Sequence, residues 1–378
     1  MRPRSARAPA PTPAVSSGVT TLELFFDLVF VFAVTQLTGV VRHGHGPADL
    51  ARAGLILFVL WWMYDGFAWL TNNVSTTSTS RRVLLLFAMA AFLVIAVAVP
   101  DAFGHDGVIF GVAYLALVLT HLGMFTLAQS TLSARAIWGI APFNLGCALL
   151  VLAAGWFTGA ADWLLWGAAA AVLLAAMVRR AESGFELRPG HFAERHGLIV
   201  IIALGESVVG IGVGAEGQLH EPAVVLTALL GLALAAALWW LYFDRDDEEG
   251  AQALAGMTTE GRARGALFAY SIGVLVLVAG IVLAAAGLET AVAHPHGHLE
   301  TWAVWTLVAG VAAYLLGLGL FRRLLHLPGA WVRPAAALPV LACAALGLWV
   351  SGAAEIAAVT AVLALAIVAD RATSPALT

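Results

Sequence analysis

Long apolar runs joined by short polar connections make up most of this sequence, and they constrain its fold more than any other feature. Of the 378 residues, 61% are hydrophobic and only 11% are charged, whereas roughly a quarter of an ordinary soluble domain is charged. Because a soluble domain of this size needs a mostly polar outer layer, much of this chain must lie in lipid. The sequence therefore predicts an all-α polytopic membrane protein.

A helix needs about 20 apolar residues to cross a bilayer. By that measure the sequence predicts twelve transmembrane helices. The predicted spans are Thr21–Val41, Leu50–Leu70, Val83–Val99, Val108–Leu127, Ala136–Ala154, Trp163–Val178, Phe192–Val213, Ala223–Phe243, Ala266–Ala286, Trp302–Phe321, Ala335–Val350 and Glu355–Ala369.

The arginines test this helix count, since basic residues accumulate in short loops on the cytoplasmic side. All 19 basic residues are Arg. With a cytoplasmic N-terminus, 17 of these 19 fall on the cytoplasmic side, and only Arg42 and Arg52 fall on the other. We therefore predict a multi-pass protein of the cytoplasmic (inner) membrane with both termini in the cytoplasm.

The two halves of the chain resemble each other in three blocks that occur in the same order. Six helices per half would give two parallel six-helix repeats, as in parallel-repeat transporters; the alternative is chance similarity between helices rich in Ala and Leu. We predict a disordered N-terminal tail over residues 1–19, repeats over residues 20–190 and 191–371, and a C-terminal tail over residues 372–378. The paired blocks are Trp156–Asp162 (WFTGAAD) with Trp349–Glu355 (WVSGAAE), Trp61–Tyr64 with Trp239–Tyr242, and Asp27–Val40 with Gly197–Gly210.

The composition excludes several classes of function. Without Lys the chain has no Walker A phosphate loop, no lysine Schiff base and no Ser-Lys dyad. It also lacks an H-E-x-x-H motif, and no loop or tail exceeds roughly 20 residues, which leaves no room for a soluble catalytic domain. We predict no enzymatic activity and no cofactor. The HGH and HPHGH runs lack the Cys or carboxylate of a closed metal site, so no metal is predicted either.

The expected partners follow from the same composition. A net charge of −4 without a basic cluster excludes nucleic acid as an expected partner. The expected partners are the lipid bilayer, a small ion or solute and, in a homo-oligomer, a second copy of the chain.

Polar residues within the predicted spans are the candidates for function, because an ionised group at mid-membrane costs about 2.5 to 3.5 kcal/mol. In the first helix Glu23, Asp27 and Thr38 fall on one stripe, and Gln36 lies about 180° away from Asp27. This helix therefore needs protein or water on two sides and is predicted to be central. Asp65 lies at about the depth of Asp27. The two carboxylates form either a proton or cation relay or a pair of interfacial caps tied to Arg81 or Arg82.

Glu206 is the strongest single candidate. It lies 12 residues beyond Glu194, which places it about 18 Å into the bilayer on a helix. Its counterpart in the first half is Gln36, so the two could form a hydrogen-bonded pair or an ion site near a pseudo-axis. The alternative is a structural bond to a neighbouring helix. The glycines near Glu206 would let a helix or ligand approach closely: Gly205, Gly210, Gly212 and Gly214.

Two neighbouring polar residues are weaker candidates. Ser207 lies in GESVVG, which lacks the final glycine of the G-x-S-x-G elbow, so it is not predicted to be a nucleophile. His121 has no carboxylate at ligand spacing and is predicted to be a core histidine.

Two blocks carry a family resemblance. ELFFDLVFVFAVTQL (Glu23–Leu37) and HFAERHGLIVIIALGESV (His191–Val208) resemble the low temperature requirement protein A (LtrA) family of bacterial multi-pass proteins. The resemblance extends over nearly the whole chain from Thr21. It implies a membrane protein linked to cold adaptation and carries over no catalytic residue, because the family has no established molecular activity. The first block is also similar to the pore-lining first helix of endolysosomal potassium channels, with Phe26 in place of a serine.

Together these observations favour an ion or small-solute transporter or channel. The alternatives are a non-transporting structural or regulatory membrane component of cold or stress adaptation, or an intramembrane enzyme. The predicted pathway residues are Asp27, Gln36, Asp65 and Glu206, supported by Glu23, Thr38, Glu194, Ser207 and His121.

Overall fold

The computed structural model describes residues 18–44, 46–74, 78–126, 131–181 and 187–373. Among these residues every regular element is helical, and 12 helical stretches are long and apolar enough to cross a membrane. The predicted all-α fold and the predicted number of spans are therefore confirmed.

The elements follow the predicted spans, with extra short helices after the eighth span. In chain order they are α1 (Thr21–His43), α2 (Pro47–Asn73), α3 (Thr79–Ala98), η1 (Val99–Asp101), α4 (Gly107–Phe125), α5 (Thr131–Ala154), α6 (Ala160–Ala181), α7 (Pro189–Gly214), α8 (Pro222–Phe243), α9 (Asp246–Gly256), α10 (Thr259–Gly265), η2 (Ala266–Gly273), α11 (Val274–Ala293), α12 (Thr301–Leu324), α13 (Val332–Ala342), α14 (Ala344–Trp349) and α15 (Gly352–Thr373). The segment η2 is a π-helix that continues directly into α11.

Local sequence signals explain where several helices begin. Thr20 caps α1 in a capping box with Glu23: the Thr20 backbone N–H donates to the Glu23 carboxylate at 2.8 Å, and the Glu23 N–H donates to the Thr20 hydroxyl at 3.3 Å. A proline at the first position starts α2, α7 and α8, where its missing N–H costs no hydrogen bond. Pro339 and a break at Cys343 divide the eleventh span into α13 and α14.

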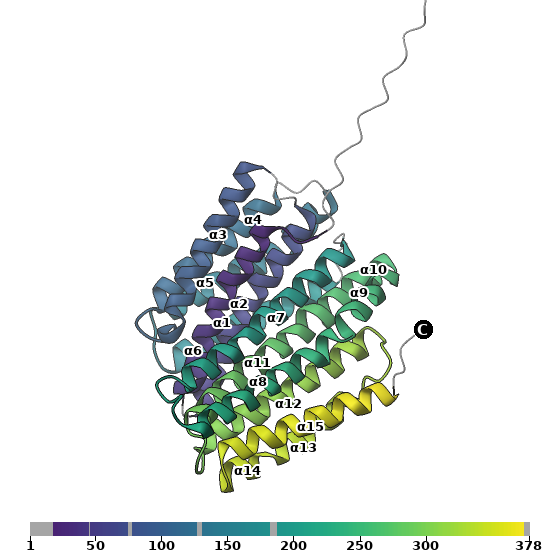
Figure 1. The fold of residues 1–378 in the computed structure, drawn as a ribbon. Helices are drawn as coiled ribbons and strands as arrows, with labels where there is room; N and C mark the ends of the chain where they lie inside the picture. The colour runs from purple at the N-terminus through teal and green to yellow at the C-terminus, as the bar shows by residue number, and fades with distance from the viewer. Residues whose placement is uncertain (1–17, 45, 75–77, 127–130, 182–186, 374–378) are drawn as a thin grey trace, which may run out of the picture.

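The helices form one bundle in which α1, α7 and α11 lie between two groups (Figure 1). The group α3 to α6 lies on one side and the group α12 to α15 on the other. Helix α1 packs against α2, α3, α7 and α11. Its opposite face is exposed, with Phe25 at 52% and Leu28 at 55%, so α1 contacts protein on several sides without being enclosed.

Helix α1 begins and α15 ends at the same end of the bundle (Figure 1). We call this the near end, and we call the opposite end, where α1 finishes, the far end. Helix α7 runs in the same direction as α1, because residues farther along α1 contact residues farther along α7. The contacts are Glu23 with His191, Asp27 with Arg195, and Thr35 with Glu206.

Glycines allow α7 to lie close against α11. A Cβ on Gly214 would collide with the carbonyl oxygen of Glu289, and one on Gly210 would lie 3.2 Å from the carbonyl oxygen of Ala285. The predicted close approach therefore holds at these two positions. At Gly205 and Gly212 no atom lies within 4 Å of such a Cβ.

Candidate functional site

A buried polar cluster joins α1, α2 and α7 at the near end. It consists of Glu23, Asp27, Thr71, His191 and Arg195, and we call it the near-end cluster. Arg195 forms an ion pair with Asp27 and donates a hydrogen bond to the Thr71 hydroxyl at 2.9 Å. The Glu23 carboxylate lies 3.8 Å from the same guanidinium. All these side chains are buried, so the positive charge of Arg195 compensates acidic groups that would be costly alone.

His191 completes the near-end cluster in a defined tautomer. Its Nε2 lies 3.2 Å from Glu23 Oε1, and its Nδ1 lies 3.5 Å from the amide nitrogen of Asn72. That amide is oriented by Arg188, whose N–H donates to Asn72 Oδ1 at 2.8 Å and whose carbonyl accepts from Asn72 Nδ2 at 3.0 Å. Because an amide nitrogen only donates, Nδ1 of His191 accepts, and Nε2 carries the hydrogen that points at Glu23.

The next residue of α7 after Arg195 contacts a different carboxylate. His196 Nε2 lies 3.3 Å from Asp65 Oδ1, and the Ser271 hydroxyl donates to the same oxygen at 2.8 Å. Asp27 and Asp65 therefore lie beside consecutive residues of α7, as a shared depth predicts, but each has its own partner. The basic partner of Asp27 is Arg195 rather than Arg81 or Arg82.

A second cluster lies toward the far end and contains Thr35, Arg42, Glu206 and Glu289. We call it the far-end cluster. The Thr35 hydroxyl donates to Glu206 Oε2 at 2.7 Å, and Arg42 forms an ion pair with Glu289 of α11. Glu289 is close enough to Glu206 for the two charges to interact. Glu206 is 5% exposed, so it points into protein and not toward lipid.

A pocket of about 530 Å³ opens at the far end, beside this cluster. Thr35 and Arg42 belong both to the cluster and to the wall of the pocket, so a single side chain separates Glu206 from it. Gln36 also lines the pocket. Thr35, and not Gln36, contacts Glu206, because one residue along a helix turns the side chain by about 100°. The full lining is Thr35, Gln36, Gly39, Val40, Arg42, His43, Gly44, Asp49 and Pro100.

Apolar residues separate the two clusters. Thr35 lies 8 residues beyond Asp27, about 12 Å along the axis of α1. The intervening buried apolar side chains are Phe30, Ala33 and Val34 on α1 and Ile199, Val200, Ala203 and Leu204 on α7. The far-end pocket and the near-end cluster are therefore not connected by polar groups along the contact between α1 and α7.

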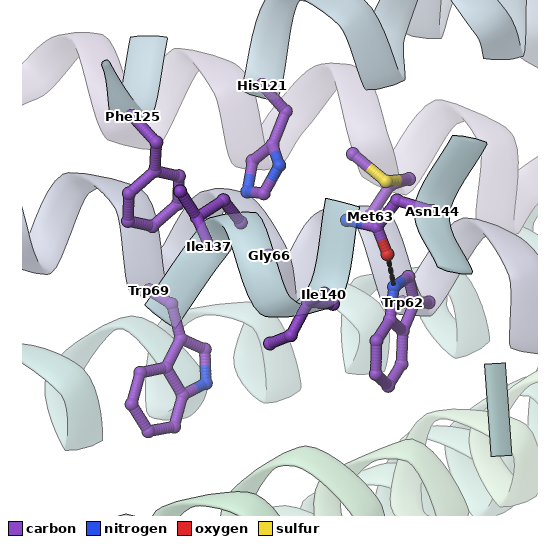
Figure 2. A pocket seen from close by; sticks show the side chains of 9 residues that line it. All are labelled: Trp62, Met63, Gly66, Trp69, His121, Phe125, Ile137, Ile140 and Asn144. Carbon is purple, nitrogen blue, oxygen red and sulfur yellow. Dashed lines mark hydrogen bonds between the residues drawn. The ribbon is translucent and has the colours of Figure 1, made fainter. Parts of the chain in front are cut away.

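His121 lies away from this contact, in the first half of the bundle. It borders a cavity of about 20 Å³ together with Gly66 and Phe125, which leaves room for about one water molecule (Figure 2). On the same cavity wall the Trp62 indole donates to Asn144 Oδ1 at 2.9 Å. The His121 ring is packed edge-on against Phe67 and Phe125, with centroids 5.1 Å away in each case. It is buried, but it is not part of either cluster.

The remaining predicted residues have local roles. Thr38 donates to the carbonyl of Val34 within its own helix at 3.2 Å. Ser207 is buried beside Glu206. Glu194 accepts a hydrogen bond from the backbone N–H of Val19 at 3.3 Å, at the near-end surface.

The buried arginines were missed by sequence reasoning, which treated them as loop charges. Arg195 is 1% exposed, and Arg322 and Arg333 are 0% and 2% exposed. The latter two form ion pairs with Asp246 of α9, and Arg333 also bonds Asp370 at 3.0 Å. The sequence does contain a pattern that predicts the near-end cluster. Two acids four residues apart on α1 (Glu23, Asp27) match two bases four residues apart on α7 (His191, Arg195). A spacing of four places side chains on the same face of a helix. His196, Ser271 and Glu289 give no comparable pattern.

Comparisons with known proteins cover this whole site. The sequence profile described as Bacterial low temperature requirement A protein (LtrA) matches residues 18–369. An uncharacterized protein of Rhizobium meliloti (strain 1021) is 30% identical over 291 residues, which cover 72% of this chain and 69% of that protein. No solved structure matches the chain. Both clusters and the far-end pocket lie within the residues that the family profile matches.

Proposed function

This chain belongs to the bacterial low temperature requirement A family, and from that premise we propose that it moves an ion or a small solute across the cytoplasmic membrane along the contact between α1 and α7. The observation that carries the proposal is the far-end pocket, whose lining residue Thr35 donates a hydrogen bond to Glu206. Acidic groups within membrane spans are rare and tend to mark substrate or ion paths. Among the described residues, Glu206 has a hydroxyl and not a base as its hydrogen-bond partner.

We place the near end in the cytoplasm and divide the chain into parallel repeats over residues 20–190 and 191–371. The bias of arginines toward one side supports the orientation. The order of helix contacts supports the repeats: α1 packs on α3, α3 on α4, α4 on α5 and α5 on α6, while α7 packs on α11, α11 on α12, α12 on α13 and α13 on α15. In addition, α2 packs on α6 as α8 packs on α15.

In this proposal the conformation described here is open to the far end and closed to the near end. The apolar residues between the clusters block the path, so transport requires a route past them to open toward the near end while the far-end pocket closes. Rigid-body movement of one group of helices against another is the usual way to alternate access around a central site. Glu206 would then meet the transported species at the base of the pocket.

Flux into reconstituted vesicles tests the proposal. Purified protein would be screened with cations, anions and small neutral solutes, and any transported species would then be measured with Glu206→Gln, which keeps the shape of the side chain and removes its charge. We expect flux to fall about tenfold or more, equivalent to about 1.4 kcal/mol. Glu300→Gln, at an exposed position just before α12, is the matched control and should transport normally.

Unchanged flux in a correctly folded Glu206→Gln protein would remove this residue from the path. Absence of flux for every solute class would reject transport itself. The alternative is then a non-transporting structural or regulatory component, which one observation favours: Glu23 and Asp27 are paired with bases and so already act as bonds between helices. In that case Glu206→Gln and Asp27→Asn would lower only the stability of the protein.

A further inference from the structure

His196 Nε2 and Asp65 Oδ1 lie 3.3 Å apart, within ion-pair distance, yet Nε2 makes no hydrogen bond to any described residue in this conformation. The Nδ1 atom of His196 lies 2.9 Å from the carbonyl oxygen of Phe192. A carbonyl only accepts, so Nδ1 carries a hydrogen. In a neutral imidazole Nε2 would then be an acceptor, facing the Asp65 carboxylate at 3.3 Å. Two acceptors at this distance repel, so one proton bound by the pair would stabilise the contact, either as imidazolium beside carboxylate or as imidazole beside carboxylic acid.

An irregular helix segment supplies a third group to this pair. Ser271, which donates to Asp65, lies on the π-helix η2, and its backbone carbonyl accepts a hydrogen bond from the Trp61 indole at 2.6 Å. Short π-helical segments within α-helices occur frequently at functional sites. One hydrogen bond to Asp65 therefore comes from η2, whose π-helical backbone differs from the regular α-helix α11 that follows it.

Tyr270 and Asp247 lie on the near-end side of this buried pair. His196 is 0% and Asp65 1% exposed. From η2, the Tyr270 ring packs edge-on against the imidazole with centroids 5.6 Å apart, and its buried hydroxyl has no hydrogen-bond partner among the described residues. Asp247 is partly exposed and packs against α7 at Gly197, where a Cβ would lie 2.8 Å from Oδ1.

The other charged groups around the pair are already compensated. On the side of α1, Asp27 is paired with Arg195. From α2, Tyr64 lies toward that ion pair, with its ring 5.7 Å from the Arg195 guanidinium. From α7, His191 points its hydrogen at Glu23.

We propose that Asp65 and His196 form an exchangeable proton-binding site at the junction of α2, α7 and η2, and that the proton is the coupling ion of the transport proposed above. Asp65 and His196 bind the proton between them, and Ser271 donates a hydrogen bond to the carboxylate. This inference names the coupling ion and therefore rests on the proposed transport function. The existence of the proton site itself can be tested without transport.

The first experiment measures the protonation of the pair in the full chain. Protein with ring-¹⁵N-labelled histidine would be studied in lipid vesicles by solid-state NMR across about pH 5 to 8, with the His196 signals identified from the His196→Gln difference. We expect Nδ1 to keep its hydrogen throughout and Nε2 to show one reversible transition. If Asp65 holds the proton instead, Nε2 stays unprotonated, and infrared difference spectra over the same range should contain a change in carboxyl protonation that is absent in Asp65→Asn. His105→Gln, at an exposed position, should leave both signals unchanged.

A His196 spectrum and an Asp65 carboxyl signal that both stay constant while the exposed histidines titrate would overturn the proposal, because the pair would then be a fixed structural contact. Ser271→Ala removes one small hydroxyl and keeps the test possible if Asp65→Asn does not fold. It should move the midpoint of the transition, and an unmoved midpoint would exclude Ser271 and with it the site as described.

Flux driven by a pH gradient separates the two proposals. If His196 titrates and no solute moves, the proton site stands and the transport proposal falls. If flux occurs and neither its rate nor its direction follows the pH gradient, transport stands and coupling to the proton is rejected.

Discussion

Replacing Arg195 by Met should destabilise the protein strongly, because it leaves acidic groups buried without their base. Asp27 is 0% exposed and Arg195 is its ion-pair partner, whereas Glu23 keeps contacts with His191 and Thr20. Most of the cost should therefore come from Asp27. Breaking a buried ion pair by removing one partner typically costs about 3 to 5 kcal/mol.

A double substitution checks the cause of this loss. In Asp27→Asn with Arg195→Met the stranded carboxylate is removed together with its base, so the double variant should be more stable than Arg195→Met alone by about 1 to 3 kcal/mol. A loss of packing around the long Arg195 side chain would instead persist in the double variant.

The measurement is the free energy of unfolding in mixed micelles at neutral pH, followed by near-ultraviolet circular dichroism. Arg323→Met is the control, since Arg323 is exposed at the end of α12, and exposed substitutions usually change stability by about 0.5 kcal/mol or less. If Arg195→Met and Arg323→Met differ by less than about 1 kcal/mol, the near-end cluster does not stabilise the bundle as argued here.

Three further substitutions test the packing and the other buried charges. Gly214→Val should be strongly destabilising because its Cβ would meet the backbone of α11, whereas Gly212→Val should be tolerated; equal unfolding temperatures would contradict the close contact between α7 and α11. Arg333→Met should cost less than Arg195→Met in the same unfolding assay, since Asp246 keeps Arg322 as a partner. Glu355→Gln should leave the free energy of unfolding unchanged or raise it at neutral pH. The reason is that Glu355 is buried and neither carboxylate oxygen has a hydrogen-bond partner among the described residues. A decrease of more than about 1 kcal/mol in the free energy of unfolding would show that the charge of Glu355 is compensated.

The spans were predictable because lipid imposes a simple requirement on each of them. A helix such as α1 must be apolar over about 20 residues, and that property is visible in one short stretch of sequence. The short polar helices α9 and α10 leave no such signal, and the region between residues 243 and 266 was predicted only as a connection. These helices pack their few apolar side chains, such as Leu254, against the rest of the bundle.

The partners of the polar residues were harder to predict, because they depend on the rotation of each helix. Aligning the two halves paired Gln36 with Glu206, but Thr35 makes the contact. An error of one residue turns a side chain by about 100°, which is enough to move it from one neighbouring helix to another. The arginines posed a different difficulty, since the rule that places basic residues near the cytoplasm does not distinguish an exposed loop residue from Arg195, which lies within the first two turns of α7 and is buried.

Arg195 and His196 are consecutive residues of α7, but their contacts with α1 and α2 differ in whether they depend on pH. Arg195 and His196 point about 100° apart and connect α7 to α1 and to α2, respectively. Arginine keeps its charge at every accessible pH, so the bond to α1 persists, whereas the bond to α2 changes when the pair gains or loses its proton. If α7 moves during transport, we therefore expect α1 and α7 to move together against α2 and η2. A disulfide engineered between α1 and α7 should preserve flux, and one between α2 and α7 should stop it until it is reduced. The opposite pattern would show that the Arg195 contact is the one that breaks.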